Sequence, residues 1–289
     1  MKKKIVLWVI MVFILSLPVL MAAGETSKSR LFIIGGGSRP VEMMEKFTAL
    51  AKQSPHKKTV IFPMASGSPH ESGKAMQEEL SALGLPEVTY HVWDRTKAQN
   101  VENVRLLDGV GSIYFTGGDQ VLLADALVNT PVHKRLLEIY ETGGVIGGTS
   151  AGAAVMSELM ITGNEKRGEE ERAFAKILVD NIEAVDGFGF IKTAIIDQHF
   201  VARRRHNRLI SLVAEHPRLL GIGIDESTAI IVTGRDVFEV IGSQNVIVYD
   251  AHHADIDIQP SGILSGHHFI MHILKAGDKF DLRTRDLVR

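Results

Sequence analysis

The sequence predicts an α/β fold in which a three-layer, doubly wound, mostly parallel sheet is followed by antiparallel strands at the C-terminal end. The main observation is that short apolar runs alternate with amphipathic helical patterns from residue 31 to residue 146. The connections between these segments are short, as in parallel sheets whose strands are joined by helices. The later apolar runs follow one another with only turns between them, which favours antiparallel pairing.

The first half of the chain contains the alternating elements. Apolar runs bounded by glycine or polar residues predict strands, and apolar residues three or four positions apart predict helices. In chain order we expect a strand at 31–34, a helix at 43–50, a strand at 59–63, a helix at 73–85, strands at 87–92 and 112–115, helices at 121–127 and 131–141, and a very short strand at 145–146.

The second half is less regular. Residues 161–186 are rich in charge, and we expect an excursion on the surface, with a solvated helix as the alternative. The remaining pattern predicts strands at 193–197, 220–224, 229–232, 237–241 and 246–249, and a helix at 201–215. Because the chain has 289 residues, 45% of them hydrophobic, and no recognisable linker, we expect one domain over residues 24–289.

The first segment has the pattern of a secretory signal peptide. Lys2, Lys3 and Lys4 precede an apolar run at 5–20, which small residues follow. We expect a signal peptide over residues 1–23, cleaved near Ala23, and an exported protein, periplasmic or secreted. An uncleaved membrane anchor is the alternative, and the membrane is contacted only through this segment.

Composition excludes several classes of function. The formal net charge is −2, from 32 basic and 34 acidic residues, which gives no reason to expect a nucleic-acid partner. The chain has no cysteine, so disulfides, thiolate metal sites and a cysteine nucleophile are excluded. The glycine run at 35–37 lacks the spacing of a dinucleotide site, and the C-terminal histidines lack helical metal-ligand spacing. We therefore expect no cofactor and no metal, and we leave a homodimer open.

A candidate nucleophile lies between a predicted strand and a predicted helix. Residues 148–152 read Gly-Thr-Ser-Ala-Gly, the G-x-S-x-G pattern of a nucleophile elbow, with Ser150 at its centre. Small neighbours suit a sharp, strained turn, and a helix predicted at 151–160 would direct its first amides at a developing oxyanion. The alternative is a serine that only completes a glycine-rich turn.

A serine nucleophile needs a base and an orienting acid. Among twelve histidines, His199 is the leading candidate, because it follows directly after a buried strand, where parallel sheets collect functional side chains. Asp225 and Glu226 follow another buried strand, and the pattern alone does not choose between them. The order serine, histidine, acid differs from that of α/β-hydrolases.

Four motif blocks occur in one order along the chain. They read TGGDQ at 116–120, GGTSAGA at 147–153, DQHF at 197–200 and GIGIDE at 221–226. Together with the arginines after His199, which complete an H-F-x-x-R-x-R-x-x-R pattern, the blocks resemble cyanophycinases of the aspartyl dipeptidase-like serine peptidase family, S51. The resemblance extends from about residue 31 to the final strands. It implies a class I glutamine amidotransferase-like, three-layer fold.

The resemblance also implies roles for individual residues. Ser150 would be the nucleophile, His199 the base and Glu226 the triad acid. Gly118 and Ala151 would present oxyanion amides. The positions that correspond to substrate contacts are Gln120, Asp197, Gln198, Arg203, Arg205 and Arg208. The alternative for the three arginines is a solvated helix face.

The implied activity is that of an exported serine peptidase. It would hydrolyse the β-aspartyl-arginine linkages of cyanophycin, or of a similar aspartyl polymer, to dipeptides through an acyl-enzyme. The alternatives are an aspartyl or isoaspartyl dipeptidase acting on short peptides, and a binding protein of the same fold without turnover. The stretch 164–186 looks longer and more charged than the corresponding loop in cyanophycinases, which bears on the substrate more than on the reaction.

Overall fold

The computed structural model describes residues 29–167, 174–234 and 236–288. The predicted signal peptide at 1–23 lies outside the described residues. No helix in the described part of the chain combines the length and the hydrophobicity needed to cross a membrane.

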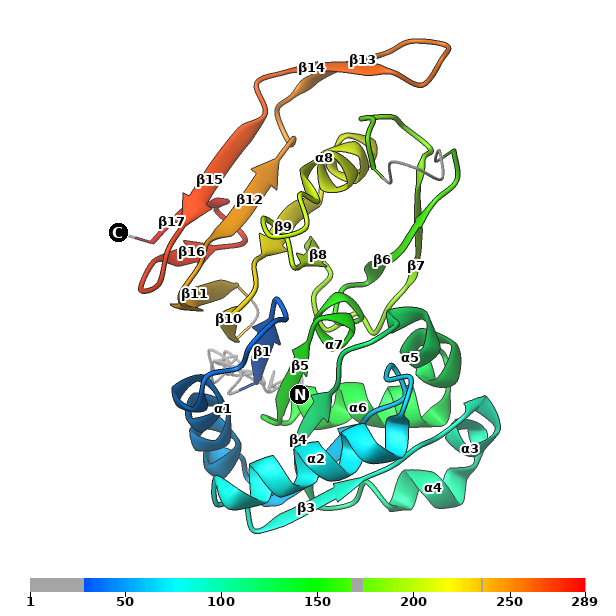
Figure 1. Ribbon diagram of the computed structural model, residues 1–289, viewed down its shortest axis with the longest axis vertical. Helices are drawn as coiled ribbons and strands as arrows, with labels where there is room; N and C mark the ends of the chain where they lie inside the picture. The colour runs from blue at the N-terminus through cyan, green and yellow to red at the C-terminus, as the bar shows by residue number, and fades with distance from the viewer. Residues whose placement is uncertain (1–28, 168–173, 235, 289) are drawn as a thin grey trace, which may run out of the picture.

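A nine-stranded sheet forms the centre of the molecule, in the order β17-β16-β11-β10-β1-β5-β4-β2-β3 (Figure 1). The five strands from β1 to β3 in this order pair in parallel, and the pairs from β1 to β17 are antiparallel. The strands are β1 Arg30–Ile34, β2 Lys58–Phe62, β3 Glu87–Tyr90, β4 Val110–Phe115, β5 Val145–Thr149, β10 Thr228–Thr233, β11 Val237–Gly242, β16 Lys279–Asp281 and β17 Asp286–Leu287.

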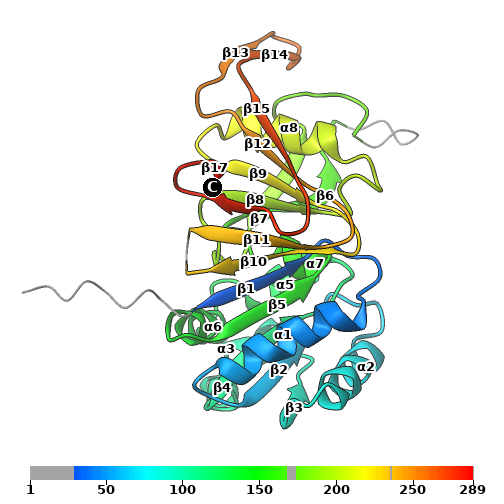
Figure 2. The ribbon, with the colours of Figure 1, turned by 90° about the vertical axis from the view of Figure 1, so that its left-hand side faces the viewer.

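Helices cover both faces of the parallel part of this sheet, which is why its strands read as continuous apolar runs. Phe32, Ile61 and Tyr114 face α1 and α2, whereas Ile33 and Phe115 face the helices on the other side. Figure 2 shows α1 and α2 in front of the sheet. The helices are α1 Val41–Gln53, α2 Pro69–Ala82, α3 Arg95–Gln99, α4 Val101–Arg105, α5 Gln120–Leu127 and α6 Pro131–Glu141.

A second sheet of four strands, in the order β15-β12-β9-β8, packs beside the antiparallel part of the first. Its outer face carries α8 through an apolar cluster that includes Ile195, Leu212 and Tyr249. The elements are β8 Ala194–Gln198, α8 His206–Glu215, β9 Leu220–Ile224, β12 Val246–Asp250 and β15 Ile270–Leu274. Two further strand pairs, β6 Leu159–Glu165 with β7 Ile182–Asp186 and β13 Asp255–Ile258 with β14 Leu264–His267, complete the described fold together with the short helix α7 Ala151–Ala154.

The predicted α/β class with antiparallel C-terminal strands is confirmed. The structure adds two details. The large sheet is mixed, and the strands predicted at 193–197 and 220–224 belong to the second sheet. Helices α3 and α4, which the sequence pattern did not indicate, are each five residues long and therefore too short for periodicity to reveal.

Three predicted helical segments are wrong or too long. The helix expected at 151–160 ends at Ala154, because the next carbonyls, of Val155 and Met156, accept hydrogen bonds from the segment 188–191. The helix expected at 201–215 begins only at His206, because Arg204 has a φ of 53° and interrupts it. The described part of 161–186 forms the antiparallel pair β6 and β7, so the solvated-helix alternative is wrong there.

Candidate active site

Ser150 lies in the sharp turn between β5 and α7, with a φ of 53° and a ψ of −111°. Few residues with a side chain adopt this backbone conformation, and such strain is typical of functional turns. A Cβ on Gly148 would come within 2.3 Å of the carbonyl oxygen of Gly152, and a Cβ on Gly152 within 2.2 Å of that of Phe115. The two glycines of the motif are therefore required by close backbone packing around the turn.

His199 and Glu226 extend from the second sheet toward Ser150. The Nε2 atom of His199 lies 2.9 Å from the Oγ of Ser150, and its Nδ1 lies 2.6 Å from an Oε1 of Glu226. Because an ionised carboxylate only accepts hydrogen bonds, Nδ1 carries the ring proton and Nε2 accepts from the serine hydroxyl. The three side chains form one continuous hydrogen-bonded chain with the geometry of a serine triad.

Asp225 contacts a different partner from that of its neighbour Glu226. Its side chain is buried, and its Oδ1 accepts a hydrogen bond of 2.9 Å from the backbone amide of Ala202. It thereby ties the end of β9 to the turn that follows His199. The sequence pattern had not decided which of the two acids orients the histidine. In the structure, Glu226 is the one hydrogen-bonded to the imidazole.

The electrostatic surroundings keep His199 neutral. Burial lowers the pKa of its imidazole below the ordinary value, the hydrogen bond that it donates to Glu226 raises it in part, and the guanidinium groups of Arg203 and Arg205 lower it further. At neutral pH the ring can therefore accept a proton from Ser150.

The glycine run at 35–37, which lacks the spacing of a nucleotide motif, lies against the triad. Gly36 has a φ of 105°, and a Cβ there would lie 2.4 Å from the His199 ring. A Cβ on Gly37 would lie 2.7 Å from the Cβ of Glu226, and the carbonyl of Gly35 accepts the amide of His199 at 2.7 Å. The run makes room for the base and acid, a role that its position after the first strand could not reveal.

The backbone at Gly118 approaches the nucleophile from the end of β4. Its φ is 137°, and a Cβ there would lie 1.9 Å from the carbonyl oxygen of Ala65. The adjacent Gly117 would bring a Cβ within 3.3 Å of that of Ser150. On the other side of the serine, Ala151 is the first residue of α7. Of the two residues expected to provide oxyanion amides, Ala151 thus follows Ser150 directly and Gly118 lines the same cavity as Ser150.

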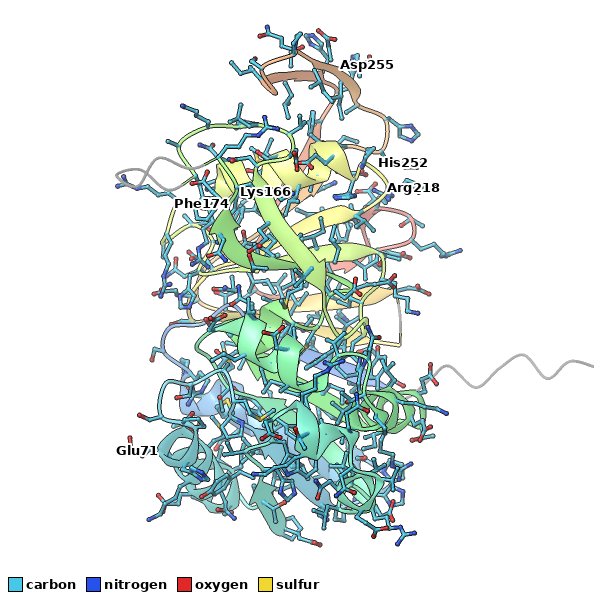
Figure 3. The ribbon with its side chains drawn as sticks, turned by 90° about the vertical axis from the view of Figure 1, so that its right-hand side faces the viewer. Glu71, Lys166, Phe174, Arg218, His252 and Asp255 are labelled. Atoms are coloured by element: carbon cyan, nitrogen blue, oxygen red, sulfur yellow. The ribbon has the colours of Figure 1, made fainter. Side chains whose placement is uncertain are left out.

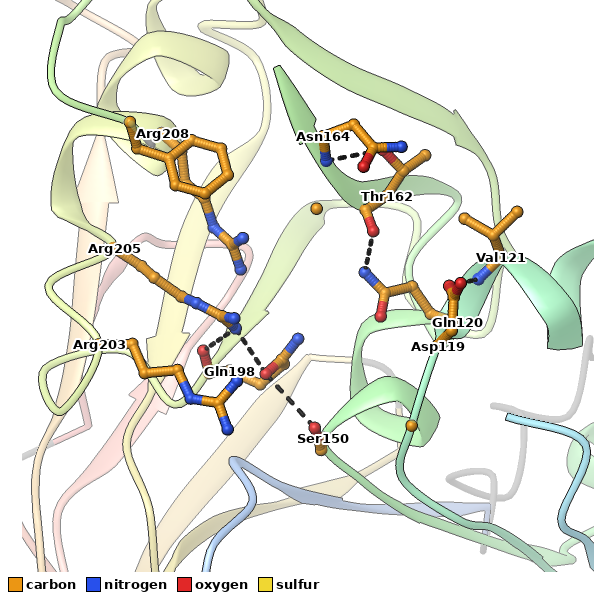
Figure 4. A pocket seen from close by; sticks show the side chains of 13 residues that line it. Asp119, Gln120, Val121, Ser150, Thr162, Asn164, Gln198, Arg203, Arg205 and Arg208 are labelled. Atoms are coloured by element: carbon orange, nitrogen blue, oxygen red, sulfur yellow. Dashed lines mark hydrogen bonds between the residues drawn. The ribbon is translucent and has the colours of Figure 1, made fainter. Parts of the chain in front are cut away.

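A cavity of about 230 Å³ opens above the serine (Figure 4). Arg203, Arg205 and Arg208 lie on the left of it in this view, with Gln120 on the right and Ser150 below. The lining residues are Gly118, Asp119, Gln120, Val121, Ser150, Thr162, Gly163, Asn164, Phe174, Gln198, Arg203, Arg205 and Arg208.

Five of the six residues expected to contact substrate line this cavity, and Asp197 does not. Asp197 is 1% exposed. Its carboxylate accepts hydrogen bonds from the Nε of Arg208, at 2.7 Å, and from the Nη2 of the same side chain. The strand β8 directs this carboxylate into the protein, while the neighbouring Gln198 faces the cavity. Asp197 is thus a buried counter-ion that holds the guanidinium of Arg208 in position.

The remaining arginines differ in exposure. Arg203 is exposed at the cavity, whereas Arg205 donates to both the backbone oxygen and the Oε1 of Gln198, at 2.8 and 2.7 Å. Burial, followed by the charge of Arg208, lowers the pKa of Arg205 to about 10, so its guanidinium stays charged at neutral pH. Arg203 and Arg205 precede α8 in a turn, and they do not form a stripe on a helix face.

Six cavity residues were not named as site residues from the sequence: Asp119, Val121, Thr162, Gly163, Asn164 and Phe174. The last four come from the charged stretch after the nucleophile. The Phe174 ring lies 5.0 Å from the Cζ of Arg208, and its amide is held by Glu165 at 2.7 Å. In the sequence, only the length and charge of this stretch pointed to a role at the site. Its residues reach the cavity through the pairing of β6 with β7, which the sequence pattern did not predict.

The C-terminal histidines lie elsewhere. His268 lies between β14 and β15, with a φ of 62°, and His272 lies in β15. Its Nδ1 lies 3.1 Å from an exposed oxygen of Asp255. Figure 3 shows His252 and Asp255 on the side of the molecule opposite Phe174. Within the described ranges, no group of three or more His, Asp or Glu side chains could hold a metal ion.

Comparison with known proteins places the chain in a family. The model of peptidase family S51 matches residues 31–240. The chain belongs to peptidase family S51. It is a hydrolase of peptidase type.

Curated relatives match the chain over most of its length. It is 32% identical over 268 residues to a cyanophycinase of Geminocystis herdmanii, covering 89% of this chain and 95% of the relative. It is 32% identical over 270 residues to a cyanophycinase of Synechococcus elongatus, covering 90% and 81%, respectively. The family resemblance drawn from the four motif blocks is thereby confirmed.

Solved structures share the fold. A peptidase from an acI-B1 actinobacterium superposes with a TM-score of 0.63 at 24% identity and covers 88% of this chain and 96% of that one. A putative peptidase E protein from Listeria monocytogenes superposes with a TM-score of 0.50 at 22% identity and covers 74% and 98%.

Proposed function

We propose that this protein is an exported serine peptidase that degrades cyanophycin, or a similar polymer of aspartate carrying arginine, to aspartyl-arginine dipeptides through an acyl-enzyme. The observation that carries the proposal is the continuous hydrogen-bonded chain from Ser150 through His199 to Glu226. Its serine lines a cavity that three arginines also line. The similarity to cyanophycinases supports the choice of substrate.

The reaction begins when the Oγ of Ser150 attacks the scissile carbonyl carbon as His199 takes the hydroxyl proton at Nε2. Glu226 stabilises the imidazolium that forms. The developing oxyanion accepts hydrogen bonds from the amides of Gly118 and Ala151. His199 then protonates the leaving amine, an ester to Ser150 forms, and a water activated by the same ring hydrolyses it.

The nature of the product determines which bond opens. Cleavage of the amide between aspartate and its β-linked arginine would release free arginine. Release of aspartyl-arginine dipeptides requires cleavage of the backbone amide that joins consecutive aspartyl units, with the β-linkage left intact. The proposed activity is therefore hydrolysis of the backbone of the β-aspartyl-arginine polymer, which sharpens the expectation stated from the sequence.

The cationic wall of the cavity suits the carboxylates of the polymer. Arg203 and Arg205 lie close enough to His199 to lower the pKa of its imidazole, so they also provide positive potential near the scissile bond. Asp197 pairs closely with Arg208 and lies 3.9 Å from Arg205, so the exposed Arg203 and the partly exposed Arg205 are the guanidiniums that a substrate can reach. The groups they match are the α-carboxylates of the arginine branches, which are the free carboxylates of such a polymer. A substrate without acidic groups would gain nothing from this wall.

Export is proposed from the sequence pattern of residues 1–23 alone. N-terminal sequencing of the protein recovered from the periplasm and the medium of its native host tests it. A mature N-terminus near Ala23 is expected, and recovery of the full-length chain only from the cytoplasm contradicts export.

The activity is tested with the mature protein on insoluble cyanophycin and on short Asp-X and isoaspartyl peptides. Release of aspartyl-arginine dipeptides from the polymer is expected, and Ser150→Ala should reduce it at least about 10⁴-fold while keeping the fold. Cleavage of short peptides alone would instead identify an aspartyl or isoaspartyl dipeptidase.

A serine-reactive phosphonate distinguishes an enzyme from a binding protein of the same fold. The wild type should be labelled at Ser150, and Ser150→Ala should not be. A folded wild type that binds the polymer without being labelled or turning it over would contradict catalysis.

A further inference from the structure

The two walls of the catalytic cavity have opposite hydrogen-bonding character. In Figure 4 the arginines lie on one side of Ser150, and Asp119, Gln120 and Asn164 lie on the other. The character of each amide follows from which of its atoms already has a protein partner, because a side-chain amide has two N–H donors and one acceptor oxygen.

On the arginine side, the amide of Gln198 is left with its donors. Its Oε1 accepts from Arg205 at 2.7 Å, so its NH₂ group is available to a ligand. With the guanidiniums of Arg203 and Arg205, this wall offers N–H donors and positive charge. Carboxylates are the groups that match it.

On the opposite wall, the side-chain amide oxygens of Gln120 and Asn164 remain available to a ligand. The Nε2 of Gln120 donates to the backbone oxygens of Ile161 and Thr162, at 2.8 and 2.5 Å, which uses both of its N–H groups. The Nδ2 of Asn164 donates to Glu183 at 2.8 Å. The acceptor oxygen of each amide therefore remains for a ligand.

Asp119 adds negative charge to this acceptor wall. It is exposed, it lines the cavity, and it caps α5 by accepting the amide of Val121 through Oδ1 at 2.8 Å. One carboxylate oxygen makes the cap, and the second is free to accept from a ligand. No other ionisable acid lines the cavity among the described residues.

We infer that Asp119, with the amide oxygens of Gln120 and Asn164, binds the guanidinium of an arginine branch of the substrate while the arginine wall binds the α-carboxylates of its arginine branches. A guanidinium has five N–H donors and no acceptor, so it matches the two amide oxygens and the one negative charge of this wall. This inference rests on the proposed function and deepens it: the enzyme selects a dipolar aspartyl-arginine unit rather than any acidic peptide.

The test compares two soluble oligomers of three β-aspartyl units, one carrying arginine and the other carrying citrulline, whose neutral urea has nearly the same shape. The wild type should have a kcat/KM about 2- to 5-fold higher for the arginine oligomer, the size expected for one partly exposed charged contact. Asp119→Asn should bring the ratio of the two values close to one, because asparagine caps a helix as well as aspartate but has no charge.

Asp125→Asn is the matched control, since Asp125 is exposed on the same helix but does not line this cavity. It should leave the ratio as in the wild type. The rate of Ser150 labelling by the phosphonate reports whether each variant is folded, and Asp119→Ser, which also supplies a cap, repeats the measurement if the asparagine variant is not.

The outcomes separate the two proposals. Equal cleavage of both oligomers by the wild type, or an unchanged ratio in the Asp119 variants, overturns the guanidinium assignment and leaves the proposed function standing. Cleavage of neither oligomer by a wild type whose Ser150 is labelled contradicts the proposed substrate, and the assignment falls with it. A high ratio that Asp119→Asn abolishes and Asp125→Asn preserves supports the assignment.

Discussion

The nucleophile half and the base half of the site are held in place by different physical means. Ser150 comes from the large sheet and is positioned by backbone geometry, with a strained turn and glycines packed against carbonyl oxygens. His199 comes from the second sheet, and the polar residues around it are buried and paired with one another. Steric exclusion thus positions the attacking atom, whereas hydrogen bonds and charge position the group that moves its proton.

The buried pairs of the base half lie on either side of His199 in the chain. Asp197 binds Arg208, Gln198 binds Arg205, and Asp225 binds the amide of Ala202. A buried ion pair contributes little net stability, but losing one partner leaves a charge that is costly to bury. This half should therefore respond to changes in charge, and the nucleophile half to changes in volume.

The largest expected effect concerns the acid of the base half. Glu226→Gln should lower kcat about 10³- to 10⁴-fold, because an amide neither stabilises the imidazolium nor enforces the tautomer. Asp225→Asn should cost far less, since asparagine can still accept the amide of Ala202. Steady-state kinetics on the polymer measure both, and the reverse ranking would contradict the assigned acid.

Arg208→Met tests whether buried charge holds the second sheet. The variant removes the closest cation from the buried carboxylate of Asp197 and leaves Arg205 at 3.9 Å, so the free energy of unfolding should fall by about 3 kcal/mol. Urea denaturation measures the loss. Arg283→Met, at an exposed position, should change the same quantity by no more than about 0.5 kcal/mol. Equal, small losses in both variants would mean that the pair does not hold the site.

Gly36→Ala tests whether sterics extend to the base. The new Cβ would lie 2.4 Å from the imidazole of His199, and a φ of 105° is itself strained for alanine. Displacement of the ring should lower kcat about 100-fold, as small misplacements of a catalytic group do. Gly67→Ala, where nothing lies within 4 Å of the new Cβ, should have the kcat of the wild type. Unchanged kcat in both variants would remove the proposed steric role of the glycine run.

The smallest expected effect is a shift in pH dependence. His199 must be neutral to accept the serine proton, so kcat/KM falls as pH drops through its pKa, which lies below the ordinary value. Arg203→Ala removes a nearby positive charge, so the pKa should rise and the acid limb of the profile should move to higher pH. Arg203→Lys should leave the limb in place. If the acid limb of Arg203→Ala lies at the same pH as that of the wild type, solvent screens the charge of Arg203 too strongly for it to lower the pKa of His199.

The sequence by itself determined the α/β class, the strand ends that carry the site, and the identity of Ser150 and His199 as candidates. These depend on local physics: apolar periodicity, and a G-x-S-x-G turn that only small residues can make. The motif blocks added the family. The pattern could not choose between Asp225 and Glu226, since two adjacent carboxylates after one strand look equivalent until the turn after His199 folds back on one of them.

Only the tertiary structure decided how distant segments share the site. Pairing of β6 with β7 brings Asn164 and Phe174 to the cavity, and packing of the first strand beside the second sheet places Gly36 and Gly37 against the triad. It also turns Asp197 inward, toward Arg208, although the sequence resemblance had placed it at the substrate. Contacts of this kind join residues more than ten positions apart, and periodicity reports only on the nearest turns of the chain, so no local pattern could have revealed them.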